Sequence, residues 1–329
     1  MVYNFSTFGV RFLIWQTAYL GDVVLTTPLI RTVLRNFPGA EVTFVGRPFC
    51  VDLFRGWDEV RVIPFSKGFL ESFRMVKLIR HSDVALVPHR SLRTALIVLA
   101  SGVPVRIGFD RSEFPPAFNF RVPHRWEVHE IDRNLSLLEP LKVSDLVREP
   151  FLPLSREEKE KVLERFSLKE GSYVVVSPFS NFPLKEWHLE GWKEVMKRLS
   201  GKVEVVLTGV KEDLSKVKEL EGEVRFVNLV GKTTLRDLIA VIGGSRGVIA
   251  SDSSPVHIAN ALGVPAVTVY TATSPDYGFY PLKGGFVRNP TPCSPCSPNP
   301  KRCRTGTFEC LRSPDPELVL EVCEETFQV

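Results

Sequence analysis

Hydrophobic positions in the first half of the chain form short apolar runs that alternate with segments of helical periodicity. The runs that predict strands are Arg11–Trp15, Glu41–Val45, Val60–Ile63, Val84–Val87 and Val105–Ile107. The segments that predict helices are Val24–Asn36, Phe69–Arg80, Leu92–Ala100 and His129–Leu141. Short strands that alternate with helices are typical of a parallel sheet with helices on both faces. The first half therefore predicts an α/β domain.

The second half repeats this pattern. Its predicted strands are Tyr173–Val176, Glu204–Leu207, Arg225–Asn228, Gly247–Ala250 and Ala266–Tyr270. Its predicted helices are Ser155–Phe166, Leu189–Leu199, Leu214–Leu220, Leu235–Gly243 and Pro255–Leu262. The stretch Thr271–Pro316 is rich in Pro, Cys, Ser and Gly and predicts an irregular excursion. A last helix is expected at Glu317–Thr326, with the first domain as one candidate packing partner.

Length and composition favour two globular domains. A chain of 329 residues exceeds the usual size of a single core, and the weakly patterned stretch Lys142–Pro153 predicts a linker. We therefore expect an N-terminal domain over residues 1–150 and a C-terminal domain over residues 151–329. The net charge of +4 is too small to indicate a nucleic-acid partner. Because Arg11 interrupts the apolar run Phe5–Tyr19, this run predicts a first strand and not a signal peptide, so we expect a cytoplasmic protein.

Two polar segments follow apolar runs in corresponding positions of the two halves. Leu20–Pro28 follows Val10–Trp15, and Ser251–His257 follows Gly247–Ala250. Each segment places an Asp at the carboxyl end of a strand, where open α/β sheets bind their ligands. The repeat predicts two domains that face each other across a cleft. Asp22 would then act on one substrate while the second segment holds another.

The first segment has a plain structural alternative. Gly21 permits a tight turn between strand and helix. Asp22 falls near the start of the following helix, where Asp is a common capping residue. From composition alone, a capping role for Asp22 is the better interpretation.

The second segment is the stronger signal for a ligand. The hydroxyls of Ser253 and Ser254 and the backbone N–H groups of a helix N-terminus make an anion site, which the helix dipole strengthens. His257 lies one turn further on the same side, within reach of a phosphate. The alternatives are a buried structural histidine at position 257 and a capping role for Asp252.

Other polar loops follow predicted strands. Ser180 and Asn181, with Lys185 shortly after, could hold a diphosphate. The acidic pair of Glu212 and Asp213 could accept hydrogen bonds from a ribose. Solvated loop residues are the alternative in both places.

A basic turn and an aromatic loop belong to the first half. The turn carries His89, Arg90 and Arg93 at the start of a helix, and it could bind an acidic acceptor or be ordinary surface charge. The Pro-rich loop Phe114–Phe120 could touch a lipid surface or cover the core, and the core is the preferred interpretation.

Four cysteines are closely spaced near the end of the sequence: Cys293, Cys296, Cys303 and Cys310. Their number and the Cys-x2-Cys start suit a structural zinc site. Two disulfides and a set of free thiols are the other interpretations, and the spacing alone does not decide among them. None of the three implies catalysis.

Several common motifs are missing. The sequence has no P-loop, and neither a Gly-x-Gly-x-x-Gly nor a Gly-x-Ser-x-Gly elbow follows a predicted strand. It also lacks an Asp-x-Asp pair of the kind that holds a metal ion in many sugar-nucleotide enzymes. A diphosphate would then be neutralised by Lys185, a helix dipole and hydroxyl groups.

Taken together, the motifs resemble those of the ADP-heptose–lipopolysaccharide heptosyltransferases, glycosyltransferase family 9. The similarity runs in order through nearly the whole chain and rests on Leu20–Pro28, Arg106–Phe109, His129-Glu130-x-x-Arg133, Lys185-x-Trp187 and Asp252-Ser253-Ser254-x-x-His257. The cysteine-rich segment is similar to that of heptosyltransferase II-type members.

The resemblance implies a GT-B fold, an inverting transfer of heptose from ADP-heptose to the lipid A–Kdo inner core, and no cofactor for catalysis. It implies that the N-terminal domain holds the acceptor and that Asp22 is the general base. In the C-terminal domain, Lys185 and the turn from Asp252 to His257 would hold the diphosphate, with contacts from Ser180 and Asn181. Glu212 or Asp213 would bind the ribose, and Thr233 would lie near the adenine. Gln16 and Asn181 depart from residues found in some members.

We assign Gly21, His89, Arg90 and Arg93 to the acceptor. Peripheral contact with the cytoplasmic face of the inner membrane is expected. The alternatives are a GT-B enzyme that moves another sugar, a nucleotide-sugar epimerase, and a non-enzymatic nucleotide-binding module in which Asp22 is dispensable. Neither the heptose position nor the oligomeric state follows from the sequence.

Overall fold

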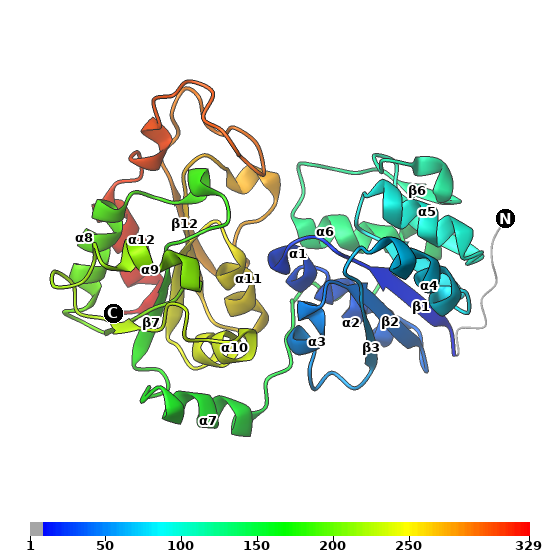
Figure 1. Ribbon diagram of the computed structural model, residues 1–329, viewed down its shortest axis with the longest axis horizontal. Helices are drawn as coiled ribbons and strands as arrows, with labels where there is room; N and C mark the ends of the chain where they lie inside the picture. Colours follow the sequence, from blue (N-terminus) through cyan, green and yellow to red (C-terminus); the bar gives the residue numbers. More distant parts are fainter. Residues whose placement is uncertain (1–8) are drawn as a thin grey trace. The chain divides into compact units, whose positions relative to one another are not determined.

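The computed structural model describes residues 9–329. Its chain divides into two compact units, with the boundary between Pro153 and Leu154. Each unit is an α/β domain built on one six-stranded sheet (Figure 1). Of the apolar run Phe5–Tyr19, residues 5–8 lie outside the described residues, and Arg11–Trp15 forms the first strand as expected.

The first unit alternates strands with helices. Its strands are β1 (Arg11–Trp15), β2 (Glu41–Gly46), β3 (Val60–Pro64), β4 (Val84–Val87), β5 (Val105–Phe109) and β6 (Phe120–Val122). Its helices are α1 (Leu20–Val24), α2 (Thr27–Asn36), α3 (Phe49–Leu53), α4 (Phe69–Ile79), α5 (Leu92–Ala100) and α6 (Glu130–Leu135). All strand pairs are parallel, in the order β3-β2-β1-β4-β5-β6.

The second unit repeats the topology of the first. Its strands are β7 (Tyr173–Ser177), β8 (Glu204–Leu207), β9 (Val227–Asn228), β10 (Gly247–Ser251), β11 (Ala266–Tyr270) and β12 (Gly284–Arg288). Its helices are α7 (Arg156–Arg165), α8 (Leu189–Leu199), α9 (Leu214–Val217), α10 (Leu235–Gly243), α11 (Ser254–Ala261) and α12 (Pro316–Phe327). The parallel order β12-β11-β10-β7-β8-β9 is the doubly wound order of the first sheet. Both units are therefore Rossmann-like.

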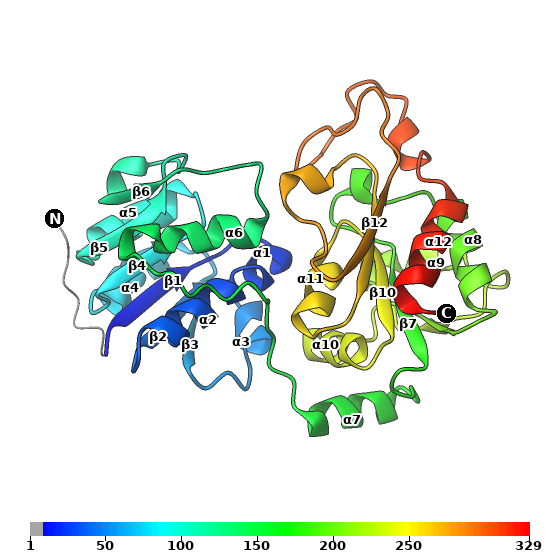
Figure 2. The same cartoon turned by 180° about the vertical axis from the view of Figure 1, so that it is seen from behind.

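Side chains of each sheet alternate between two apolar layers. In β1, Leu13 and Trp15 join the cluster beneath α4 and α5, whereas the ring of Phe12 packs 4.8 Å from that of Phe37 at the end of α2. This burial on both faces explains why the strands are continuous apolar runs. In the second unit, α8 and α12 lie side by side in both views and share one core cluster (Figures 1 and 2). The sequence left open a return of the last helix to the first domain; its packing partners here are α8, β10, β11 and β12 of its own unit.

The expected helix Val24–Asn36 is wrong at its start. The structure has two helices, α1 and α2, with a break at Leu25 and Thr26. Pro28 lacks the N–H that a continuous helix needs at this position, so it can stand only in the first turn of α2. The hydroxyls of Thr26 and Thr27 donate to the carbonyls of Asp22 and Val24 at 2.7 Å each, which satisfies part of the end of α1.

Two edge strands were missed by the sequence analysis. The strand β6 begins inside the aromatic loop, and β12 lies within the stretch expected to be irregular. The start of β12 is hidden because Gly284 and Gly285 have low strand propensity. Gly284 adopts φ +125°, and a Cβ there would lie 1.9 Å from the carbonyl oxygen of Ala266. Only glycine allows this approach of the two backbones.

Candidate active site

The topology explains why the polar loops gather in each unit. In this strand order the switch point lies between β1 and β4 in the first sheet and between β7 and β10 in the second. At a switch point the connections from two neighbouring strands leave toward opposite faces, which opens a crevice at the carboxyl ends. The segments around Asp22 and His89 flank the first crevice. Those around Ser180 and Asp252 flank the second.

A buried ion pair stands at the second switch point. The Lys185 ammonium lies 2.8 Å from an Asp252 carboxylate oxygen, and the two side chains are only 12% and 10% exposed. Lys185 also lies over the ring of Phe182, 5.5 Å from its centroid. The N-cap of α11 is Ser253, so Asp252 does not occupy the capping position considered as its alternative. Asp252 instead holds Lys185 in place.

The segment that carries Lys185 is fixed from two sides. Trp187 is buried against α8, and a Cβ at Gly191 would lie 2.3 Å from its ring, so Gly191 is what admits the indole. On the other side, the Thr271 hydroxyl at the end of β11 donates to the Leu184 carbonyl at 2.7 Å. These contacts anchor the short 3-10 helix Pro183–Lys185 beside Asp252. A preorganised lysine at a strand end is suited to an anionic ligand.

At the N-terminus of α11, the hydroxyl of the N-cap serine bonds away from the helix. The Ser253 hydroxyl donates to the Ser251 carbonyl at 3.1 Å and makes no side-chain cap, and Ser254 begins the helix. The Ser251 hydroxyl donates to the Pro178 carbonyl at 2.7 Å, which ties the loop after β10 to the loop after β7. His257 is 5% exposed, with its ring centroid 6.3 Å from that of Phe279. The burial of this histidine agrees with the structural alternative.

The loop after β7 depends on a residue to which the sequence analysis gave no role. Glu186 accepts a hydrogen bond from the Ser180 backbone N–H at 2.9 Å and pairs with Lys216 at 2.8 Å. Ser180 in turn accepts from the Phe182 N–H at 3.2 Å, while Asn181 is exposed. The only signal for Glu186 in the sequence was its place beside Lys185.

The candidate ribose and adenine residues lie on neighbouring loops. Glu212 is exposed in the 3-10 helix Lys211–Asp213, whereas Asp213 is buried and accepts from the Val210 N–H at 3.0 Å. Asp213 therefore stabilises the turn and leaves Glu212 as the exposed carboxylate. Thr233, half-buried, precedes the N-cap of α10. Gly231, which makes a backbone bond to Gly209, brings this loop against the 3-10 helix.

Asp22 caps its own helix. One carboxylate oxygen accepts from the Tyr19 N–H at 3.2 Å in a capping box, and the side chain is half-buried. Gly21 is buried beside it in α1. The structural role weighed for Asp22 is thus real.

The basic turn is less cationic than its composition indicates. His89 lies 3.0 Å from the Thr17 hydroxyl, which joins the loops after β4 and β1. Burial, and then the nearby charges of Lys67 and Arg90, lower the pKa of His89 to about 4. The imidazole is therefore neutral near pH 7. Arg90 lies over the Trp126 ring at 5.1 Å, and Arg93 donates to the Lys67 carbonyl.

A buried ion pair near Asp22 was not predicted. Glu130 pairs with Arg133, which is also bonded to the backbone carbonyls of Arg125, Trp126 and Val128. Burial raises the pKa of Glu130 to about 7; Arg133 opposes this shift and the charge of Asp22 adds to it. The motif His129-Glu130-x-x-Arg133 thus forms a charged support beside the candidate base.

The four cysteines near the end of the chain are free thiols. Cys296 and Cys303 pack against a cluster that contains Cys310, Leu184 and Ala272. Within residues 9–329, no three His, Cys, Asp or Glu side chains are arranged to hold a metal ion. As they stand, these thiols do not present the zinc site that was one of the three interpretations.

The thiols differ in their pKa values. Hydrogen bonds from the Thr305 hydroxyl and the Phe308 N–H lower the pKa of Cys303 to about 7, while burial and the neighbouring cysteines raise that of Cys310 to about 11. Because thiolates react with iodoacetamide and thiols do not, we expect Cys303 to be alkylated at least about tenfold faster than Cys310 at pH 7. Peptide mass spectrometry checks this, with Cys303→Ser as the control. Protection of Cys303 until a reductant or a chelator is added would contradict free thiols in favour of a disulfide or a bound metal.

Paired Rossmann-like units, each with polar loops at its switch point, are typical of GT-B glycosyltransferases. The profile of glycosyltransferase family 9 (heptosyltransferase) matches residues 72–305, and the chain belongs to this family. It is therefore a glycosyltransferase, as the sequence motifs predicted.

Known proteins similar to this chain carry heptosyltransferase names. Lipopolysaccharide heptosyltransferase 3 of Escherichia coli is 27% identical over 277 residues, which cover 77% of this chain and 81% of that protein. The solved structure of E. coli ADP-heptose lps heptosyltransferase II matches with a TM-score of 0.81 at 24% identity, over 97% of this chain and 99% of that one. E. coli heptosyltransferase WaaC with ADP matches with a TM-score of 0.74 at 21% identity, over 96% and 100%. These structures confirm the expected GT-B fold.

Proposed function

We propose that this glycosyltransferase moves heptose from ADP-heptose to the lipid A–Kdo inner core of lipopolysaccharide, with Asp22 as the general base, inversion at the anomeric carbon and no metal ion. The observation that carries the donor half is the buried Lys185–Asp252 pair at the N-terminus of α11. The names of the relatives, which are lipopolysaccharide heptosyltransferases, support the choice of sugar and acceptor.

The second unit supplies the donor site in this proposal. Lys185 and the first turn of α11 place positive charge where a diphosphate would sit, so the leaving group is stabilised as its charge develops. We assign Ser180, Asn181, Ser253, Ser254 and His257 to the same diphosphate, Glu212 to the ribose and Thr233 to the adenine. No divalent cation is needed, because the Lys185 ammonium and the helix dipole of α11 stabilise the negative charge of the diphosphate.

The first unit supplies the base and the acceptor contacts. Asp22 takes the proton of the acceptor hydroxyl as the oxygen attacks the anomeric carbon. The new C–O bond forms while the bond from the anomeric carbon to the diphosphate breaks, and ADP leaves with the electron pair. Attack on the face opposite the leaving group inverts the anomeric carbon. Arg90 and Arg93 are the candidate contacts to acidic acceptor groups, and His89, neutral near pH 7, orders their loop.

The lipid acceptor places this reaction at the cytoplasmic face of the inner membrane, with peripheral contact. Among residues 9–329, no helix has the length and apolar character of a membrane span.

Calorimetry with ADP and UDP in the presence of EDTA tests the donor site. We expect ADP to bind at least about tenfold more tightly than UDP. Replacing Lys185 by methionine should weaken the binding of ADP by about 10–100-fold, because a charge-assisted hydrogen bond to phosphate is lost. Lys193→Met is the matched control: Lys193 on α8 pairs with Glu190 and Glu223, and its loss should leave ADP binding unchanged. A preference for UDP, or a need for a divalent metal, would overturn the donor assignment.

A further inference from the structure

The first unit exposes apolar side chains on two neighbouring helices, α4 and α5. On α4, Phe69 and Leu70 are 77% and 80% exposed and Phe73 is 61% exposed. On α5, Leu92, Leu96 and Leu99 are all exposed. The spacings 69/73 and 92/96/99 put each set on one side of its helix. Isolated exposed apolar residues are ordinary, but a continuous surface of this kind marks an interaction site.

These side chains do not serve the core. Met75 and Ile79 are the residues of α4 that are buried beneath the helix, and Thr94, Ala95, Ile97 and Val98 are the buried residues of α5. The rings of Phe69 and Phe73 pack edge to face, 5.2 Å apart, in an exposed position. The face thus carries apolar side chains beyond those that hold each helix on the sheet.

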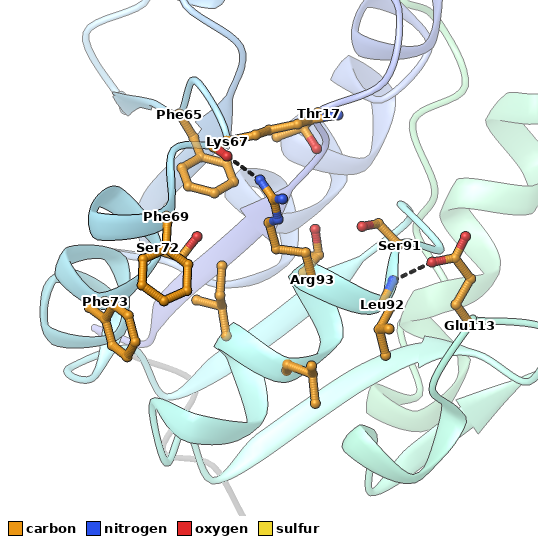
Figure 3. Close-up of a pocket in the computed structure, with 13 residues that line it drawn as sticks. Thr17, Phe65, Lys67, Phe69, Ser72, Phe73, Ser91, Leu92, Arg93 and Glu113 are labelled. Atoms are coloured by element: carbon orange, nitrogen blue, oxygen red, sulfur yellow. Dashed lines mark hydrogen bonds between the residues drawn. The ribbon is translucent and has the colours of Figure 1, made fainter.

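An open groove of about 620 Å³ runs between the two helices. Phe65, Phe69 and Phe73 line it from the α4 side, and Leu92, Leu96 and Ile97 from α5. Figure 3 shows Lys67, Arg93 and Thr17 together at one end of this groove, with Phe69 and Phe73 further along it. The groove is therefore amphipathic, with a basic end and an apolar length.

The charge around the face is predominantly basic. Burial lowers the pKa of Lys67, and the charges of nearby Arg47 and Arg93 lower it further. Exposed Arg74 and Lys77 follow on α4. The acidic groups of the face accept backbone hydrogen bonds: Glu71 from the Ser66 and Gly68 N–H groups, and Glu113 from the Leu92 N–H at 2.6 Å. The four cations Lys67, Arg74, Lys77 and Arg93 outnumber the two carboxylates, so the net charge of the face is positive.

We propose that this α4–α5 face docks on an anionic phospholipid bilayer, with Phe69, Leu70 and Phe73 in the interface and Lys67 and Arg93 on lipid phosphates. Amphipathic surfaces with aromatic and leucine side chains beside Lys and Arg bind membranes in this way. Each basic residue near an anionic surface strengthens the attachment of the protein to the membrane. The aromatic loop Phe114–Phe120, considered earlier for this role, does not fit it, because Phe118 is 1% exposed and packs on Gly108.

The docking face adjoins the candidate acceptor residues of the same unit. Thr17 lines the groove and also lies 3.0 Å from His89, and Arg93 belongs to both. Docking here would bring the loops after β1 and β4 to the lipid surface where the acceptor is embedded. This purpose of docking rests on the proposed function.

Flotation of the full chain with vesicles tests the proposal. We expect binding to vesicles of equal parts phosphatidylglycerol and phosphatidylcholine to be at least about tenfold stronger than to phosphatidylcholine alone. The double variant Phe69→Ser/Phe73→Ser should lose at least about tenfold in this binding, because two aromatic side chains no longer enter the interface. Phe308→Ser, at an exposed phenylalanine of the second unit, should bind as the parent does. Unchanged vesicle binding by the double variant would overturn the docking face.

Two further measurements separate this proposal from the proposed function. The double variant should keep its ADP affinity, and its transfer to a deacylated acceptor, while losing transfer to an acceptor embedded in vesicles. Equal loss with both acceptors would count against docking, whereas absence of transfer by the parent protein would count against the function itself. If sedimentation shows a dimer of the parent chain that the double variant lacks, the face serves a second copy of the chain and the bilayer proposal is wrong.

Discussion

Replacing Asp22 by asparagine is expected to lower turnover by about 10²–10⁴-fold while ADP affinity stays the same. Asparagine keeps an oxygen that can accept from the Tyr19 N–H, so the cap of α1 survives and only the basic carboxylate is lost. Asp22→Ala removes both the basic carboxylate and the cap, and we expect the lost cap to lower the folding stability by roughly 0.5–2 kcal/mol. Initial rates at saturating ADP-heptose, with thermal melting of each variant, give the measurement.

The two variants separate chemistry from capping. If Asp22 only caps α1, Asp22→Asn turns over at nearly the parent rate and Asp22→Ala is the poorer enzyme. Glu71→Gln is the matched control, because Glu71 caps α4 with the same capping-box geometry in the same unit. With a deacylated acceptor, this control should leave turnover unchanged.

Replacing Arg133 by methionine is expected to destabilise the protein by about 3–5 kcal/mol at pH 8, because it leaves Glu130 as a buried carboxylate without its partner. Three backbone carbonyls, those of Arg125, Trp126 and Val128, lose their donor as well. Arg148→Met is the control, since Arg148 forms a half-exposed pair with Asp132. Urea unfolding of both variants gives the comparison, and a loss from Arg133→Met no larger than that of the control would contradict a structural role for the pair.

The loss of folding stability caused by Arg133→Met should depend on pH. The pKa of Glu130 in the folded protein is raised to about 7, above its ordinary value of 4.5. A carboxyl with a raised folded pKa binds its proton more tightly when folded, so its contribution to stability falls as pH rises from the unfolded to the folded pKa. Without Arg133 the folded pKa rises further, and we expect a smaller loss at pH 5.5 than at pH 8. A loss independent of pH would show that Glu130 is not the group involved.

Sequence reasoning located the strand-end loops because their signal is local. Buried parallel strands are apolar runs, and the polar residues that end them mark the sheet edge where Asp22, Lys185 and Asp252 lie. The sequence analysis predicted one helix over Val24–Asn36 and missed the break between α1 and α2, where the hydroxyls of Thr26 and Thr27 donate to backbone carbonyls. Nor could it reveal β12, which depends on an approach that only Gly284 allows.

The remaining features of the site that the sequence did not predict depend on contacts between residues far apart in the sequence. The roles of Glu186 and Lys216 come from a pairing across 30 residues. Asp252 pairs with Lys185, whereas the sequence analysis gave Asp252 a place in the diphosphate-binding turn, with a cap as the alternative. The exposed apolar surface of α4 and α5 was also hidden, because Phe69 and Phe73 have the spacing of core residues, and burial alone separates them from Met75 and Ile79.

The most direct test of the central claim is transfer itself. The protein is incubated with ADP-heptose and a lipid A–Kdo acceptor in EDTA, and the product is analysed by mass spectrometry and by NMR of the new anomeric centre. We predict addition of heptose, release of ADP and an inverted anomeric configuration. No transfer, transfer that requires a divalent metal, or retention of configuration would contradict the account.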